Sequence, residues 1–164
     1  MAGKNRGYDR NHTGVIRAVR FFALLAVLLA LCFTLLLGAA LLGDAGMEPG
    51  YGEGRPVLYL RPGEVRRGDL VLLRLEGSGT VLRRVVAAAG DTVEVSNGVV
   101  TLNGLSERGS YNITRTDARE GGPAYPLLLR RGEYFVLGDK RESALDSRAF
   151  GVITREQILG RLLF

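Results

Sequence analysis

The chain has few of the residues on which most hydrolytic and metal sites depend. It holds one cysteine, one histidine and no tryptophan, and only two of its 22 basic residues are lysines. One cysteine cannot form an internal disulfide, and with one histidine it supplies too few ligands for a zinc site. The histidine, His12, lies in the N-terminal tail. We therefore exclude a Ser-His-Asp or Cys-His catalytic site in the rest of the chain, and expect no metal and no other cofactor.

One long apolar run stands near the N-terminus. Residues 21–42 carry no charge, and as a helix they would be about 33 Å long, enough to cross a hydrocarbon core of about 30 Å. A cleaved signal peptide is the alternative, because residues 38–40 are small, but its apolar region usually spans about 7–15 residues. We predict a cytoplasmic tail over residues 1–20, an uncleaved transmembrane helix over 21–42 and an extracytoplasmic domain over 43–164.

The distribution of charge agrees with that topology. Residues 1–20 hold five basic residues and one acidic residue, and positive charge before a first helix keeps that end in the cytoplasm. The domain after the helix holds 17 of the 22 basic residues and 16 of the 17 acidic ones. We therefore expect a single-pass protein of the cell membrane, and the excess of positive charge gives no reason to expect nucleic acid as a partner.

The region after the apolar run is predicted to be mostly β. Asn97-Gly98 between two apolar segments is typical of a type I′ hairpin turn. Residues 105–126 are polar and glycine-rich and are predicted to form a long loop. Residues 157–163 fit a closing strand or a helical turn. The expected strands are residues 57–60, 69–75, 81–88, 92–95, 99–102, 134–137 and 150–154.

The segment from Gly138 to Gly151, GDKRESALDSRAFG, is the most specific in the chain. It resembles the last conserved box of type I signal peptidases, which are membrane-bound serine endopeptidases. Three further segments resemble boxes of that family in the same order: 43–49, 68–73 and 83–93. The resemblance implies a coiled β-sheet domain on one transmembrane helix. It also implies a nucleophilic serine and a general-base lysine, and neither is found.

The nucleophile position of the resemblance falls at Gly46, just before Met47-Glu48-Pro49. Glycine has no side chain, so no acyl-enzyme can form there. The position that helps to hold the oxyanion in the family falls at Asp44. A carboxylate there would repel a developing oxyanion, although Asp44 also fits a simple solvated residue at the membrane exit.

The general-base position falls at Arg83, in the frame Arg83-Arg84 followed by Gly90-Asp91. A lysine can act as a base because burial lowers its pKa, whereas the pKa of arginine stays above about 12. Residues 68–73 resemble an apolar strand of the family, and we expect them to be structural.

The last box keeps five residues that match the family and loses two. The matching residues, expected to brace the site, are Asp139, Arg141, Asp146, Ser147 and Arg148. Ala144 stands where the family has a hydroxyl that orients the lysine, and Lys140 stands where it has asparagine. We predict an ion pair between Asp146 and Arg148. A substitute dyad would have to join Lys140 to Ser143 or Ser147, since Lys4 is cytoplasmic.

These losses favour a pseudoenzyme, similar to the inactive homologues that assist pilus assembly in Gram-positive bacteria. Such a protein would bind an extended peptide segment of a secreted protein or a pilin by strand addition, which needs no dyad. The expected peptide-binding residues are Gly43, Ala45, Met47, Pro49, Val81, Leu82 and Val85. Two alternatives stay open: an active type I signal peptidase that cleaves signal peptides, and a copy of the gene with no selected role.

Overall fold

The structure is a computed structural model that describes residues 6–61, 63–75, 77, 79–107 and 114–163. Of residues 6–13 it describes only the backbone. The chain divides into two compact units, Met1–Leu37 and Gly38–Phe164. The first is helical and the second is mostly β, as the sequence predicts.

The first unit consists of the helix α1, Arg6–Leu36, which has 31 residues. Its part Gly14–Leu36 has 23 residues with a mean hydropathy of 2.6, and none of the most apolar window is buried. At 1.5 Å per residue this part is about 35 Å long, which is enough to cross the hydrocarbon core of a bilayer. The apolar helix is therefore confirmed, but its predicted end at Leu42 is wrong.

The helix ends at Leu36 because the next residues form an edge strand, β1, Leu37–Leu41. Gly38 lies directly against the ring of Tyr59: a Cβ built on Gly38 would come within 2.3 Å of a ring atom. Only glycine lets the backbone approach the ring this closely. The composition of Leu37–Leu41 suits an apolar helix equally well, so tertiary packing decides the conformation.

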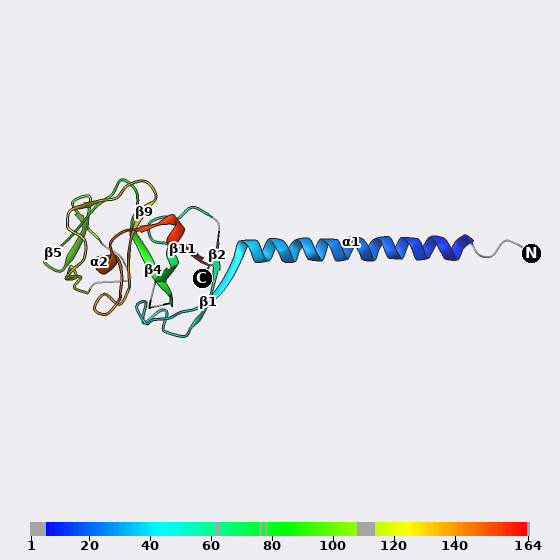
Figure 1. The fold of residues 1–164 in the computed structure, drawn as a ribbon, viewed down its shortest axis with the longest axis horizontal. Helices are drawn as coiled ribbons and strands as arrows, with labels where there is room; N and C mark the ends of the chain where they lie inside the picture. The colour runs from blue at the N-terminus through cyan, green and yellow to red at the C-terminus, as the bar shows by residue number, and fades with distance from the viewer. Residues whose placement is uncertain (1–5, 62, 76, 78, 108–113, 164) are drawn as a thin grey trace, which may run out of the picture. The chain divides into compact units, whose positions relative to one another are not determined.

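The second unit is built on a seven-stranded sheet with the order β1-β2-β11-β3-β4-β9-β10 (Figure 1). Its central pairs are antiparallel: β3 pairs with β4, and β4 pairs with β9. The strands besides β1 are β2 (Pro56–Leu60), β3 (Leu70–Leu75), β4 (Gly79–Ala87), β9 (Glu133–Leu137), β10 (Ile153–Thr154) and β11 (Ile158–Leu162).

A smaller sheet has the order β7-β6-β5-β8. Its hairpin joins β5 (Thr92–Ser96) to β6 (Val99–Leu102) through Asn97 and Gly98, whose φ angles of 51° and 80° are those of a type I′ turn. The predicted hairpin is confirmed. The sheet is completed by β7 (Leu105–Ser106) and β8 (Leu127–Leu128), two short strands that the sequence does not indicate.

Three further elements differ in detail from the prediction. The strand predicted at 150–154 is shorter, because the helix α2 (Ser147–Phe150) precedes β10. The region after β10 forms both a 3₁₀ turn, η1 (Arg155–Gln157), and the strand β11, which were predicted as alternatives. The predicted loop 105–126 begins with β7; its residues 108–113 lie outside the described part, and residues 114–126 contain no helix or strand.

Strand β4 contributes to all three apolar cores of the domain. Val86 and Ala87 pack with the small sheet, Val81 and Val85 pack with β3, β9, β10 and β11, and Leu82 packs near the start of the domain. A strand anchored at both of its ends and on several sides is held rigidly. It therefore fixes the position of the residue at its middle, Arg83.

Candidate functional site

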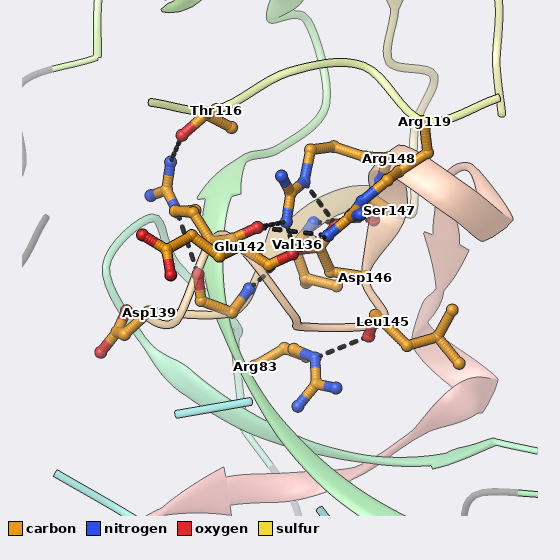
Figure 2. A network of polar contacts seen from close by, with 12 residues as sticks. Arg83, Thr116, Arg119, Val136, Asp139, Glu142, Leu145, Asp146, Ser147 and Arg148 are labelled. Carbon is orange, nitrogen blue, oxygen red and sulfur yellow. Dashed lines mark hydrogen bonds and ion pairs between the residues drawn. The ribbon is translucent and has the colours of Figure 1, made fainter. Parts of the chain in front are cut away.

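Arg83 is a completely buried cation in the middle of β4. Its Nε donates to the carbonyl oxygen of Leu145 at 2.8 Å, as Figure 2 shows, and its Nη1 donates to the carbonyl of Leu82 at 2.6 Å. These two bonds hold the guanidinium plane between β4 and the loop that carries Leu145. Since a buried charge is stable only when it is paired, a carboxylate is required nearby.

The carboxylate is supplied by Asp44. Nη1 of Arg83 donates to Oδ1 of Asp44 at 3.1 Å, and Nη2 forms a short contact with Oδ2, so the pair is bidentate. The two partners differ in exposure, because the Asp44 side chain is 27% exposed and that of Arg83 is 0% exposed. The alternative that Asp44 is a simple solvated residue is therefore wrong. It is half of an ion pair that joins positions 39 residues apart.

Gly46 lies directly against this pair. A Cβ built on Gly46 would come within 2.8 Å of Nη1 of Arg83 and within 2.9 Å of Oδ2 of Asp44. These distances are shorter than real Cβ contacts, so the guanidinium and the carboxylate fill the space into which a side chain at 46 would point. The structure thus brings together the three residues that the resemblance singles out as nucleophile, base and oxyanion positions.

Ala144 and Gly46 both pack against Gly138. A Cβ built on Gly138 would come within 2.2 Å of the Ala144 methyl group and within 2.6 Å of the carbonyl oxygen of Gly46. That carbonyl also accepts a hydrogen bond of 3.0 Å from the backbone N–H of Lys140. The loop after β9 is therefore pressed onto Gly46, with Ala144 buried behind it.

Only some of the predicted peptide-binding residues lie where a peptide beside β4 could contact them. Gly43 donates from its N–H to the carbonyl oxygen of Thr80 at 2.8 Å, which places the segment 43–46 beside the first half of β4. Strand β9 pairs with β4 only from Arg84 onward, and among the residues that the structure describes no other strand pairs with this first half on that side. The side chains of Val81, Leu82 and Val85 are fully buried, and hence only their backbone could meet a peptide.

The other predicted peptide-binding residues differ in exposure. Met47 is buried, and its sulfur accepts a hydrogen bond from the N–H of Asp139 at 3.3 Å. Ala45 is half-buried and Pro49 is exposed. Met47 is thus part of the core, whereas Ala45 and Pro49 remain accessible to a partner.

Asp146 and Arg148 form the predicted ion pair, with Nη2 of Arg148 2.8 Å from Oδ2 of Asp146 and both side chains buried. Asp146 also accepts from the N–H of Gly138 at 3.0 Å, and Arg148 donates to the carbonyl oxygen of Arg141 at 2.6 Å. Figure 2 shows Asp146 and Arg148 between Arg83 and the loop that carries Arg119. The pair therefore fixes the chain reversal from which Leu145 meets Arg83.

Further partners of the brace come from the long polar loop, which the sequence does not connect with it. The guanidinium of Arg141 contacts Glu107 at 3.2 Å and Thr116 at 3.0 Å. Arg119 donates to the carbonyl of Glu142 at 2.7 Å (Figure 2). The only signal that could have found them is the presence of acidic and basic residues in a loop that is otherwise rich in glycine.

Asp139 is held by a second arginine of β4. Its carboxylate accepts from Nε of Arg84 at 3.0 Å and from Nη2 at 2.7 Å, in a bidentate pair. The adjacent arginines of β4 thus meet two different acidic residues: Arg83 pairs with Asp44 at the start of the domain, and Arg84 pairs with the last box. Both segments are tied to the middle of the same strand.

The substitute dyad does not assemble. The hydroxyl of Ser147 is fully buried and accepts a hydrogen bond of 2.9 Å from the N–H of Val136, while Ser143 is exposed. Nζ of Lys140 instead pairs with Glu48 at 2.7 Å, and the hydrogen bond and charge of Glu48 raise the pKa of this lysine. A general base needs a lowered pKa. Lys4 lies outside the described residues.

No group of three His, Cys, Asp or Glu side chains that could hold a metal ion occurs among the residues that the structure describes.

Comparison with known proteins gives one consistent family. The family model described as "Signal peptidase, peptidase S26" matches residues 15–164. Signal peptidase IB of Staphylococcus aureus (strain N315) is 29% identical over 136 residues, which cover 72% of this chain and 71% of that protein. Signal peptidase I P of Bacillus subtilis subsp. natto is 31% identical over 106 residues, covering 60% and 57%. A crystal structure of a signal peptidase I from Enterococcus faecalis V583 is 28% identical, covers 61% of this chain and 97% of its own, and has a TM-score of 0.49.

Proposed function

The chain belongs to the signal peptidase family, peptidase S26, and on that premise we propose that it is a membrane-anchored member without peptidase activity. Its role is to hold an extended peptide segment of a secreted protein at the membrane surface. The observation that carries the proposal is the Asp44–Arg83 ion pair, which fills the space next to Gly46.

Two steps of the serine peptidase reaction lack a residue to perform them. Gly46 has no side-chain atom that could attack a carbonyl carbon, and Arg83 carries a guanidinium, which does not serve as a general base. Asp44 offers a carboxylate and no donor to the oxygen of a tetrahedral intermediate. The three replacements are mutually compatible, because the guanidinium needs both the acid and the space that glycine leaves.

Peptide binding needs none of these steps. An extended peptide can add to a sheet through backbone hydrogen bonds, with its alternate side chains in pockets. Within the described part of the chain, the first half of β4 has no strand paired to it on the side of β9, and the segment 43–46 runs beside it. Ala45 and Pro49 are accessible at this place. Pilin as the partner, and a role as an assembly factor, follow from the resemblance to inactive homologues alone.

The apolar helix would anchor the protein in the membrane. Gly14–Leu36 is long enough to span it, and the basic residues before it favour a cytoplasmic N-terminus. The β domain would then lie on the outer side, where secreted proteins emerge.

An active signal peptidase is the second candidate, and the names of the relatives favour it. It requires a nucleophile other than residue 46. Of the two serines of the last box, Ser147 is unsuited because it is fully buried and its hydroxyl accepts from the backbone of β9. Ser143 is exposed, but the nearby Lys140 pairs with Glu48 and is not a suitable base for it.

The test uses the full-length protein purified in detergent, with a secretory precursor as substrate. The wild-type protein is expected to leave the precursor intact, while a photo-crosslinker introduced at Ala45 captures its extended segment. The same crosslinker at Thr101, in the small sheet, serves as the control. Cleavage by the wild type that disappears when one serine is replaced by alanine would overturn the proposal and establish the second candidate.

A double variant tests whether the site around residue 46 can still support catalysis. Gly46→Ser combined with Arg83→Lys restores the nucleophile and a base that can lose its proton. We expect cleavage to appear when Asp44 is replaced in this double variant as well, because its carboxylate would keep the introduced lysine protonated, and in neither single variant, because each alone lacks one partner of the dyad.

A further inference from the structure

The guanidinium of Arg83 is oriented by its own chain so that one edge faces Asp44. Of its five N–H donors, the one on Nε bonds to Leu145, and one on Nη1 bonds to Leu82. The outer fork of Nη1 and Nη2 then meets the two oxygens of Asp44. This is the geometry in which arginine binds a carboxylate most strongly.

The two partners of the ion pair differ in how deeply they are buried. Arg83 is on a strand packed in all three cores and has no exposure, whereas the Asp44 side chain is 27% exposed. Asp44 can therefore move into water at much smaller cost than Arg83 can. The acids that face Arg84, Arg141 and Arg148 are less exposed, at 15%, 10% and 0%.

The same pair stands where the proposed peptide has to enter. The segment 43–46 is joined to β4 by the Asp44–Arg83 pair and by the hydrogen bond from Gly43 to Thr80. A strand that adds to the first half of β4 has to separate this segment from it. Separation removes Asp44 from Arg83, and a buried arginine without an anion is strongly unfavourable.

We propose that Arg83 is a carboxylate-binding residue, that Asp44 occupies its site in the unliganded chain, and that a bound peptide replaces Asp44 with a carboxylate of its own. This inference rests on the proposed function and adds the class of ligand: an extended peptide with an aspartate, a glutamate or a free C-terminal carboxylate at the level of residue 46. Asp44 thereby acts as an autoinhibitory contact that neutral peptides cannot replace.

The carboxylate site is tested first without any peptide. Thermal unfolding of the full-length protein in detergent is measured for the wild type and Asp44→Ala, in sodium acetate and in sodium chloride of equal ionic strength. Acetate is expected to raise the Tm of Asp44→Ala above its value in chloride and to leave the wild type unchanged, because acetate can occupy the position that Asp44 vacates. Asp44→Asn provides a second variant if Asp44→Ala does not fold. Glu48→Ala, which removes the exposed partner of Lys140 in the same segment, is the matched control.

An equal response of wild type and Asp44 variants to acetate, or no response of either variant, would overturn the carboxylate site. A response of Glu48→Ala as large as that of Asp44→Ala would do the same, since it would show a general effect of the anion.

Ligand selection is tested with two labelled extended peptides that differ by one aspartate or asparagine, by fluorescence anisotropy. The aspartate peptide should bind wild type more tightly than its partner, and Asp44→Asn should tighten its binding by about tenfold, because the resident competitor is gone. The asparagine peptide has to break the same pair in the wild type, so it should also gain from Asp44→Asn, but it should stay at least about threefold weaker than the aspartate peptide on both proteins. Binding of both peptides that is indifferent to Asp44 would refute the exchange. If neither peptide bound any variant, the proposed function would fail, and the acetate experiment alone would decide the carboxylate site.

Discussion

Adding a side chain at residue 46 is the most direct probe of the arrangement around Arg83. In Gly46→Ser the new Cβ would lie 2.8 Å from Nη1 of Arg83 and 2.9 Å from Oδ2 of Asp44. The guanidinium is the end of a flexible side chain, but three partners fix it, so it cannot move without losing bonds to Leu145, Leu82 or Asp44. Overpacking of this kind lowers the free energy of unfolding by about 1–3 kcal/mol.

The companion change Arg83→Lys removes the obstacle and part of the bonding at once. A lysine keeps the charge but donates from a single nitrogen, so it leaves buried carbonyl oxygens without a donor, at a cost of about 2 kcal/mol. In its presence a serine at 46 no longer meets a guanidinium. The double variant should therefore be more stable than the sum of the two single effects predicts, by about 1–2 kcal/mol.

Urea unfolding of the full-length protein in detergent, followed by near-ultraviolet circular dichroism of its six tyrosines, measures these differences. Gly50→Ser is the matched control, because Gly50 is exposed and the nearest atom to its added Cβ is the carbonyl oxygen of Met47, 3.6 Å away. It should change stability by less than about 0.5 kcal/mol. If Gly46→Ser costs no more than this control, or if the two site changes add within about 0.5 kcal/mol, the guanidinium does not occupy the space at residue 46.

Three further changes test the surroundings by the same unfolding measurement. Asp146→Asn should cost about 3–5 kcal/mol, because it leaves the buried guanidinium of Arg148 without its anion; a cost below about 1 kcal/mol would contradict the bracing role. Tyr125→Phe should leave stability unchanged or raise it by about 1 kcal/mol, since the hydroxyl is buried without a hydrogen-bond partner among the described residues and burial raises the pKa of Tyr125 to about 12; a clear loss of stability would reveal a partner. Glu48→Gln should cost less than about 1 kcal/mol because its pair with Lys140 is exposed, and a larger loss would show that this pair holds the segment in place.

The strands were largely predictable because local signals agree with the fold. Apolar segments separated by turn residues give β2 to β6 and β9, and Asn97-Gly98 gives the hairpin with its positive φ angles. The end of α1 was not predictable, because Leu37–Leu41 suits a helix by composition. Only the contact between Gly38 and the ring of Tyr59, 21 positions later, shows why the chain becomes extended there.

The candidate site, too, could be predicted from the sequence only in part. Its positions could be located from short boxes that resemble a known family, and the pair Asp146–Arg148 could be predicted because the two residues are neighbours in one turn. The partner of Arg83 could not, since Asp44 lies 39 residues away and its charge looked unfavourable where an oxyanion would form. Contacts between distant segments of one sequence leave no periodic pattern to detect.

The long polar loop is fastened to the small sheet at two points, Glu107 and Thr116. Glu107 donates from its N–H to Val100 and Thr116 donates to Gly98, each at 2.8 Å, so both points are tied to the same hairpin. Arg141 meets the side chains of both. The cost of closing a loop grows only slowly with its length. Extra residues inserted between these two points should therefore leave Arg83 and its neighbours undisturbed, which makes this the natural place for an epitope or a protease site that reports on which side of the membrane the domain lies.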